Sequence, residues 1–182
     1  MRKITAGIFL SLDGVAEAPD TWHFPYFNDE MGAVVQAQMD AADTMLLGRN
    51  TYEMFAAYWP DSDEDIAEYM NGARKLVVSR TLERADWQNS TVVGGEDPLA
   101  ELARLKEGEG KNLGVVGSIG LVQSLLRAGL LDELHLLVHP IVVGKGKRLF
   151  PEGDSIPLRL AGSTTLSTGV LSLVYTPDTD TK

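Results

Sequence analysis

Short apolar runs that end in a glycine or polar turn and lead into a helical pattern recur along this chain, and they restrict its possible folds more than any other feature. Residues 44–47 (TMLL) form one such run, which leads through the turn at 48–51 into a helical pattern over 52–58. Residues 113–116 (LGVV) form another, followed by a glycine-containing turn and a helix at 117–129. Repeats of strand, turn and helix predict a mostly parallel sheet covered by helices on both faces.

The remaining elements follow from the same reasoning. A helix is expected where a capping residue precedes apolar residues at helical spacing, and a strand where β-branched and apolar residues lie between turn residues. The expected strands are 3–12, 44–47, 74–78, 91–93, 113–116 and 132–138, and the expected helices are 29–39, 52–58, 61–70, 98–106 and 121–128. The runs 158–166 and 170–175, separated by Ser167-Thr168-Gly169, predict an antiparallel hairpin at the edge of the sheet.

Length and composition exclude several classes of protein. At 182 residues, with 44% hydrophobic and 23% charged residues, the chain is expected to form a single globular domain over residues 1–182. The formal net charge of −10 disfavours nucleic acid as a partner. The absence of cysteine excludes disulfides and zinc–thiolate sites, and it is compatible with a cytoplasmic location. The sequence contains no apolar run long enough to cross a membrane and no signal-peptide core, so no membrane association is expected.

Three strand ends carry residues suited to a phosphate group. Ligands of parallel α/β sheets lie at the carboxyl ends of strands, beside helix N-termini. The turn at 48–51 combines a glycine with Arg49 and the Thr51 hydroxyl, and Ser79-Arg80-Thr81 places two hydroxyls around a guanidinium. The third turn, 117–120, has two glycines around Ser118. Each turn has a purely structural alternative, as a capped helix or an ordinary polar turn.

Other catalytic and cofactor motifs are not supported. The glycines at 117 and 120 lack the GxGxxG spacing of a Rossmann fold, and residues 143–147 (VGKGK) lack the Walker spacing, so the latter are interpreted as an exposed loop. His135 lies in the expected strand 132–138 and His139 directly follows it, so the two do not share a helical face and no metal site is expected. The sequence has no GxSxG elbow of a serine hydrolase.

Several segments together carry a family resemblance. GRNTYEMFAAYWP, KLVVSRTL, GSIGLVQSLLRAGLLDELHLLVHPIVVGKGKRLFP and TGVLSLVYTP occur in this order over nearly the whole chain. They resemble the dihydrofolate reductase superfamily, and within it the branch similar to the C-terminal reductase domain of riboflavin biosynthesis (RibD C-terminal domain-like). The resemblance implies a three-layer α/β/α dihydrofolate reductase-like fold, a mostly parallel central sheet with a C-terminal antiparallel hairpin, NADPH as cofactor, and a homodimer.

The resemblance also implies positions for the cofactor. Gly48, Arg49 and Thr51 would lie beside its pyrophosphate, and Ser79 and Arg80 beside the adenosine 2′-phosphate. A second dinucleotide-binding turn would consist of Gly117, Ser118, Ile119, Gly120 and Leu121. Many relatives have two glycines where this chain has Gly117-Ser118, a departure expected to change how closely the backbone approaches the cofactor.

The substrate is expected beneath an aromatic-rich loop. On the resembled fold, residues 13–27 cover the nicotinamide and the substrate, and aromatic side chains suit a flat heterocycle such as a pyrimidinone or a pterin. The expected substrate contacts are Asp13, Trp22, Phe24 and Tyr26, with Phe27 beside them. Lys145, Lys147 and Arg148 are candidates for pairing with an anionic tail of the substrate.

The expected reaction is hydride transfer from the nicotinamide to a C=N or C=O carbon, with a proton delivered to the neighbouring heteroatom. In folate reductases a carboxylate at the start of the first helix relays this proton. Asp29 is the predicted catalytic residue, and Glu30 lies beside it. Two alternatives stay open: a non-catalytic NADP- or nucleotide-binding module, and a purely structural or dimerising domain.

Overall fold

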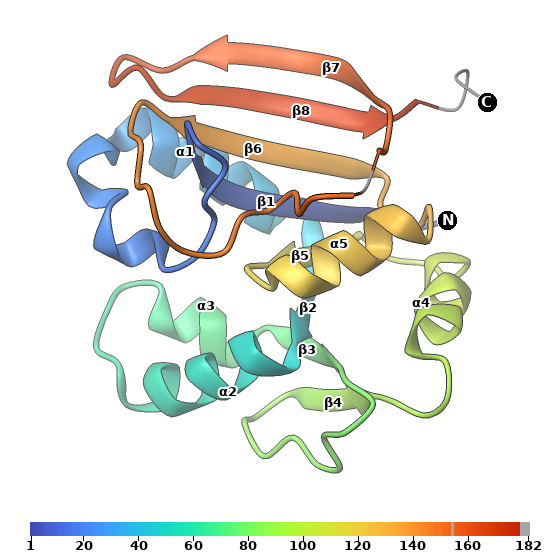
Figure 1. Ribbon diagram of the computed structural model, residues 1–182. Coiled ribbons are helices and arrows are strands. Elements are labelled where there is room, and N and C mark those ends of the chain that lie inside the picture. The colour runs from blue at the N-terminus through green and yellow to red at the C-terminus, as the bar shows by residue number, and fades with distance from the viewer. Residues whose placement is uncertain (154, 179–182) are drawn as a thin grey trace.

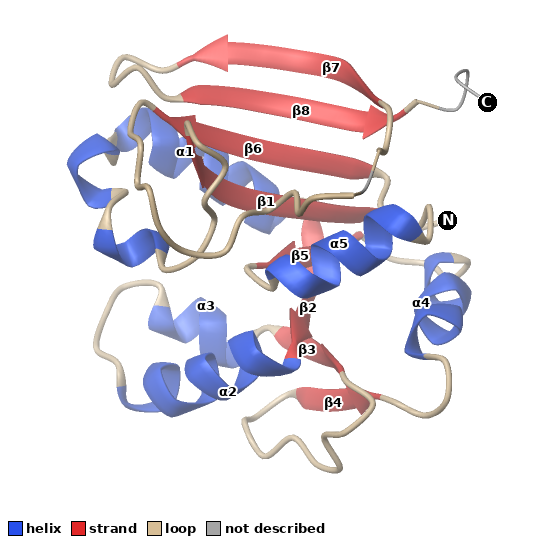
Figure 2. Cartoon of the chain, in the orientation of Figure 1, coloured by secondary structure: helices blue, strands red, loops and turns tan. Residues whose placement is uncertain are grey.

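The computed structural model describes residues 1–153 and 155–178 and contains one eight-stranded sheet in the order β4-β3-β2-β5-β1-β6-β8-β7 (Figures 1 and 2). The strands are β1 (Ile4–Ser11), β2 (Ala42–Gly48), β3 (Arg74–Val78), β4 (Ser90–Val93), β5 (Asn112–Val116), β6 (Glu133–His139), β7 (Leu158–Thr165) and β8 (Leu171–Pro177). The helices are α1 (Asp29–Asp40), α2 (Arg49–Tyr58), α3 (Ala67–Gly72), α4 (Pro98–Lys106) and α5 (Ile119–Arg127).

The pairing confirms the predicted sheet. Strands β4, β3, β2, β5, β1 and β6 pair in parallel, whereas β8 runs antiparallel to both β6 and β7. The C-terminal hairpin is therefore the antiparallel edge, and β7 is the outermost strand at that edge. Because β1 to β6 are parallel, their carboxyl ends all lie at one edge of the sheet, which is where the sequence places its candidate turns.

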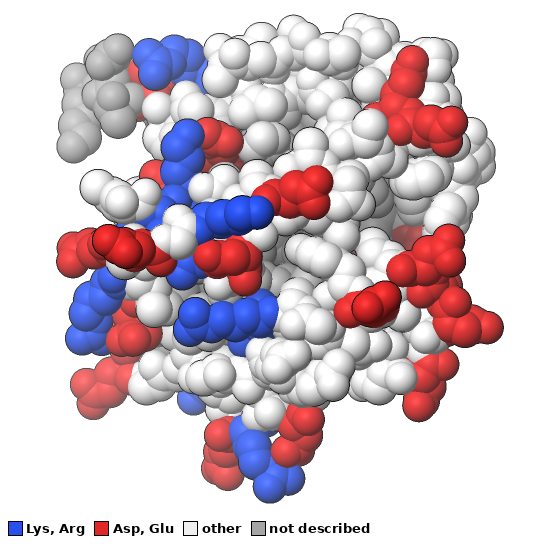
Figure 3. Space-filling model, turned by 180° about the vertical axis from the view of Figure 1, so that it is seen from behind, with Lys and Arg blue, Asp and Glu red and all other residues white. Residues whose placement is uncertain are grey.

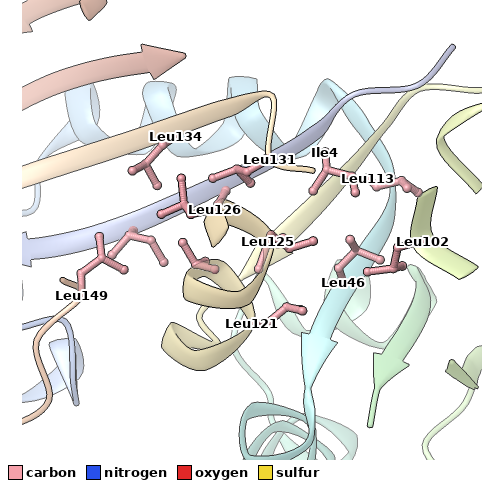
Figure 4. Close-up of a cluster of buried hydrophobic side chains, with 14 of the residues drawn as sticks. Ile4, Leu46, Leu102, Leu113, Leu121, Leu125, Leu126, Leu131, Leu134 and Leu149 are labelled. Carbon is pink, nitrogen blue, oxygen red and sulfur yellow. The ribbon is translucent and has the colours of Figure 1, made fainter. Parts of the chain in front are cut away.

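Apolar side chains on the two faces of the sheet form the core. In β1 the even-numbered residues Ile4, Ala6, Ile8 and Leu10 belong to a cluster with the apolar face of α5. Phe9 points to the other face, where it packs against a cluster that includes Met31 of α1. This alternation is the period-two pattern of a strand buried on both sides. Figure 4 shows Leu121, Leu125 and Leu126 of α5 among side chains from the neighbouring strands.

Two helices differ from their expected boundaries. Helix α2 begins at Arg49, three residues before the helical pattern suggests, because the extended Gly48 is its N-cap and residues 49–51 already form its first turn. The expected helix 61–70 is reduced to α3, which begins at Ala67. The chain before α3 forms a 3-10 turn at Trp59–Asp61 that contains Pro60, so most of the acidic stretch lies outside a helix.

Lys75 of β3 is fully buried and closes the end of α3. Its Nζ donates hydrogen bonds to the carbonyl oxygens of Met70, Asn71 and Ala73, at 2.8, 3.1 and 2.7 Å. The same ammonium lies 4.1 Å from the ring centroid of Trp87, within cation–π range. Burial lowers the pKa of Lys75 to about 8, so the group is still mainly charged at neutral pH. One side chain thus joins α3, β3 and the loop that carries Trp87.

Replacing Lys75 should therefore destabilise the fold. We expect Lys75→Met to lower the free energy of unfolding by about 2–4 kcal/mol, because buried carbonyl groups lose their donors. Lys145→Met, at an exposed lysine, is the control and should change it by less than about 0.5 kcal/mol. Urea unfolding followed by circular dichroism measures both values, and equal stability of the two variants would contradict the role of Lys75.

Candidate functional site

Three turns meet at the carboxyl ends of neighbouring strands. The strands β3, β2 and β5 are adjacent in the sheet, and they lead into the turns at 79–81, 48–51 and 117–120. In the parallel register, Gly48 is paired with Val78, the residue before Ser79. Helices α2 and α5 begin at two of these turns (Figure 1). The topology therefore brings together the three turns that the sequence singles out.

Hydrogen bonds connect the turns to one another. The Gly48 N–H donates to Ser118 Oγ at 2.7 Å, and the Ser118 N–H donates to Thr51 Oγ1 at 3.0 Å. The Arg49 guanidinium donates to Thr81 Oγ1 at 2.9 Å and pairs with Glu53 at 2.7 Å. The site is thus preformed, with Arg49 held between α2 and the turn after β3.

Close packing requires a small residue at Gly117. It adopts φ +60°, and a Cβ there would lie 3.2 Å from Thr51 Cγ2. Left-handed backbone and a tight contact together favour glycine. The Ser79 hydroxyl shapes the third turn, because Oγ accepts from the N–H groups of Thr81 and Leu82 at 3.2 and 3.0 Å.

The electrostatics of this edge suit an anion. The first N–H groups of a helix have no carbonyl partners within it, and a helix N-terminus carries partial positive charge. In α5 the Leu121 N–H already donates to the Ser118 carbonyl oxygen, so the N–H groups of Ile119 and Gly120 are the ones that face a ligand. Arg80 is exposed and forms no hydrogen bond or ion pair with any other described residue. Two helix N-termini, two arginines and several hydroxyls can together hold a ligand with more than one phosphate group.

The aromatic loop after β1 does not present its rings as one wall. Trp22 is buried, and its Nε1 donates to the Glu17 carbonyl oxygen at 3.1 Å. Phe24 is 64% exposed and Phe27 is 49% exposed. The Tyr26 hydroxyl reaches the Pro140 carbonyl oxygen at 3.5 Å, the outer limit of a hydrogen bond. Phe24 and Phe27 are therefore the rings of this loop most open to a ligand.

Asp13 connects two loops at this edge. Its carboxylate accepts hydrogen bonds from the Ser11 hydroxyl and from the N–H groups of Val143 and Gly144, at 2.6, 3.0 and 2.9 Å. These hydrogen bonds lower the pKa of Asp13 to about 2. Glu17 accepts from the Lys147 N–H in the same way, at 2.9 Å. Backbone groups of the glycine- and lysine-containing loop are thus bound by carboxylates of the chain itself, which is why that loop need not be a phosphate loop.

The start of α1 is exposed. Asp29 is the first residue of this helix, and Asn28 caps it by accepting from the Met31 N–H at 3.0 Å. Glu30 accepts from the Ser167 N–H at 2.7 Å, and this bond lowers the pKa of Glu30. Glu30 thus holds the hairpin turn, while the buried carboxylate expected of a proton relay is not provided by Asp29 in the protomer. The catalytic role of Asp29 stays a prediction.

Charge is unevenly distributed over the surface. On the face opposite to that of Figure 1, basic side chains occur mainly on the left of the view, intermixed with acidic ones. The charged side chains on the right of the view are all Asp or Glu (Figure 3).

The described part of the chain contains no group of three or more side chains suited to a metal ion. Among the described helices, none combines the length and apolar character needed to cross a bilayer.

Comparison with known proteins decides the family. The model of the RibD C-terminal domain matches residues 2–172. The chain belongs to the RibD C-terminal domain family. Two curated Bacillus subtilis (strain 168) proteins, both described as uncharacterized, are similar to it: YyaP is 29% identical over 96% of this chain and 94% of its own length. YwjB is 30% identical over 89% of this chain and 91% of its own.

Several solved structures have the same fold. A putative riboflavin biosynthesis protein from Shewanella sp. PV-4 is 23% identical, with a TM-score of 0.77 over 97% of this chain and 99% of that one. A pyrimidine reductase-like protein from Corynebacterium diphtheriae is 14% identical, with a TM-score of 0.70 over 98% and 93%. Acinetobacter baumannii RibD gives a TM-score of 0.65 at 17% identity, covering 98% of this chain and 58% of RibD. The predicted dihydrofolate reductase-like architecture is confirmed.

Two buried histidines at this edge form a pair that only the fold reveals. The rings of His23, in the aromatic loop, and His139, at the end of β6, are 6.1 Å apart. His139 Nδ1 lies 2.8 Å from the Leu137 carbonyl oxygen, so the neutral ring donates there and leaves Nε2 unprotonated. His23 Nδ1 and His139 Nε2 are buried without hydrogen-bond partners among the described residues.

This pair should make the loop sensitive to acid. Burial lowers the pKa of both histidines. The His139 ring lowers the pKa of His23 further, and Asp20 only partly opposes this. Backbone hydrogen bonds only partly oppose the effect of burial on the pKa of His139. The pKa of each histidine in the closed loop lies below the ordinary value of 6.5, so the opened loop binds protons more readily than the closed one. The closed loop is therefore fully stable above pH 6.5 and loses stability as the pH falls below that value. Trp22, whose ring lies 5.2 Å from that of His139, should report the opening.

We expect tryptophan emission to change reversibly with a midpoint below pH 6.5, without global unfolding by circular dichroism. Trp22→Phe is the control: Trp59 and Trp87 remain, but the transition should disappear. An unchanged transition in Trp22→Phe, or its persistence in a His23→Phe/His139→Phe variant, would count against the pair.

Proposed function

We propose that this protein is an NADPH-dependent reductase that transfers hydride to a small planar heterocycle of pyrimidinone or pterin type. The proposal is carried by one observation: the turns at 48–51, 79–81 and 117–120 are hydrogen-bonded into one site in a chain of the RibD C-terminal domain family. The substrate class is supported by family membership together with the exposed aromatic rings beside the site.

The residues at the site fit a dinucleotide. The first turns of α2 and α5 would hold the diphosphate through their N–H groups, with Arg49 and the Thr51 hydroxyl beside it. The Arg80 guanidinium has no partner among the described residues, and with Ser79 it would hold the 2′-phosphate. When bound, NADPH supplies the hydride. Gly117, Ser118, Ile119, Gly120 and Leu121 would form the surface against which the cofactor lies.

The substrate would lie between this cofactor and the aromatic loop. Phe24 and Tyr26 would contact a flat ring, while the buried Trp22 and the engaged Asp13 would hold the loop in place. Lys145, Lys147 and Arg148 are exposed and would pair with an anionic tail. Asp29 would deliver the proton only if a bound substrate or a second subunit removes it from water, since a proton donor at neutral pH needs a raised pKa.

A cofactor oxidation assay tests this function. NADPH oxidation is followed by its absorbance with pyrimidinone ribose-phosphates, their ribitol analogues and dihydropterins as substrates. Turnover with one of these classes supports the reductase. Binding of NADPH without turnover of any of them favours the alternative, a non-catalytic nucleotide-binding module, for which the exposed Asp29 and the engaged Glu30 are the specific observations. If the protein does not bind NADPH, the remaining alternative is a purely structural or dimerising domain.

Arg80 should decide between the two nicotinamide cofactors. Losing a charge-assisted bond to the 2′-phosphate should cost about 1.5–3 kcal/mol of binding free energy. Arg80→Ala should therefore weaken NADPH binding and leave NADH binding nearly unchanged, as measured by nicotinamide fluorescence. Arg84→Ala, which removes an exposed arginine paired with Asp86, is the matched control. Equal weakening of both cofactors by Arg80→Ala would exclude the 2′-phosphate role.

We also propose a homodimer formed through the C-terminal hairpin. Within residues 1–153 and 155–178, strand β7 pairs only with β8, so its outer edge is open, and Leu160 on this strand is 51% exposed. An open edge strand with exposed apolar side chains is an association surface. A cysteine-free NADPH-dependent enzyme of this kind would act in the reducing cytoplasm.

Light scattering should give about twice the chain mass of 19.8 kDa at micromolar concentration. Leu160→Lys should shift the mass towards the monomer, because a charge would be buried in the interface. Met54→Lys, at a 61% exposed methionine of α2, is the control and should leave the mass unchanged. A wild-type protein of one chain mass would reject the dimer.

A further inference from the structure

Ser118 adopts a backbone conformation that serine rarely adopts. It has φ 58° and ψ 57°, and it follows Gly117, which is also left-handed at φ 60°. A glycine would occupy this conformation without the steric conflict of a Cβ. Strain of this kind persists where the surrounding structure compensates for it, and such positions are concentrated at functional sites. The compensation at Ser118 is found in its hydrogen bonds.

Every polar group of Ser118 has a partner. The hydroxyl accepts from the Gly48 N–H at 2.7 Å and lies 3.3 Å from the Val116 carbonyl oxygen, to which it can donate. The main-chain N–H donates to Thr51 Oγ1, and the carbonyl oxygen accepts from Leu121 and Val122 at 2.8 and 3.0 Å. Ser118 is thus the N-cap residue of α5 and, at the same time, binds both the N-cap and the first turn of α2.

These contacts fix the two helix starts against each other. A Cβ on Gly48 would lie 3.4 Å from both Cβ and Oγ of Ser118, so the two turns already meet at van der Waals distance. The Gly48 N–H points at the Ser118 hydroxyl and is not available to a ligand. The Thr51 hydroxyl accepts from the Ser118 N–H, which leaves its own proton free to point towards an anion.

We propose that Ser118 is a positioning residue, whose hydroxyl holds the N-termini of α2 and α5 at the separation required to bind the two phosphate groups of one dinucleotide. This inference rests on the proposed NADPH binding. Without the hydroxyl, the Gly48 N–H loses its acceptor. The first-turn N–H groups of α2 and those of α5 then no longer converge on one ligand. The residue acts through α2 and is not itself a catalytic residue.

Two substitutions separate positioning from folding. Ser118→Ala removes the hydroxyl and keeps the left-handed strain, whereas Ser118→Gly removes the hydroxyl and relieves the strain. We expect Ser118→Gly to be at least as stable to heat as Ser118→Ala, yet both should weaken NADPH binding about tenfold, as expected for one lost hydrogen bond. If Ser118 matters only for stability, NADPH affinity will follow the melting temperature and Ser118→Gly will bind as wild type does.

A shorter ligand tests the geometry itself. Adenosine 2′,5′-bisphosphate carries the 2′-phosphate but only one phosphate on the 5′ side, so it does not need both helix N-termini. Its affinity should change less than twofold in either variant. A loss for this ligand as large as the loss for NADPH would overturn the proposal, because the defect would then not concern the second phosphate.

Amide hydrogen exchange keeps the test independent of the cofactor. In the ligand-free protein, the Gly48 amide should exchange at least tenfold faster in both variants than in wild type, while amides in β1 stay protected. Unchanged exchange at Gly48 would overturn the role of the Ser118 hydroxyl. If wild type binds no NADPH but Gly48 exchange rises in the variants, the proposed function fails while the coupling of the two turns stands, and a diphosphate ligand of another kind is then sought with ADP as the probe.

Discussion

The apolar face of α5 against the sheet is the contact on which the candidate site depends. Leu121, Val122, Leu125 and Leu126 are all buried, and each large apolar side chain transferred from water contributes about 1.5–3 kcal/mol. Their partners include Ile4 of β1 and Leu46 of β2 (Figure 4). Because the helix is fixed along this face, its first residue is fixed beside the end of β2. The position of the Ser118 turn is thus a consequence of core packing.

Strand order then determines which turns can act together. Strands β3, β2 and β5 are neighbours in space, although β5 follows β3 in the chain only after β4. Parallel pairing places their carboxyl ends at one edge, and the bonds of Gly48, Arg49 and Ser118 join the turns into a single site. A phosphate-binding function would need no separate loop domain here, because it would use the first-turn N–H groups that two helices packed on the sheet cannot satisfy internally.

Features with local causes could be predicted from the sequence. Asp97 and Pro98 specify the start of α4, since the Asp97 carboxylate accepts from the N–H groups of Leu99 and Ala100. Asn28 likewise specifies the start of α1. The alternation of strands and helices predicted the parallel sheet, and the Ser167-Thr168-Gly169 turn predicted the final hairpin.

Features that depend on contacts between distant parts of the chain could not be predicted from the sequence. The early start of α2 depends on Gly48 meeting Ser118, a residue 70 positions away. The burial of Lys75 depends on where α3 ends, and the pairing of His23 with His139 depends on how the aromatic loop folds over β6. The sequence shows Asp13 beside a turn, but not that residues 143 and 144 come to donate to it. The three turns of the candidate site could be named in advance from their residues and their places at strand ends, and the family resemblance added an expected common ligand.

The central claim is that the three turns bind one dinucleotide, and a crystal structure of the protein with NADP⁺ tests it most directly. We expect the diphosphate to lie between the N-termini of α2 and α5, and the 2′-phosphate to contact Ser79 and Arg80. The Gly48 N–H should still be bound to the Ser118 hydroxyl. A cofactor bound at another edge of the sheet, or a diphosphate that contacts only one of the two helices, would contradict the account.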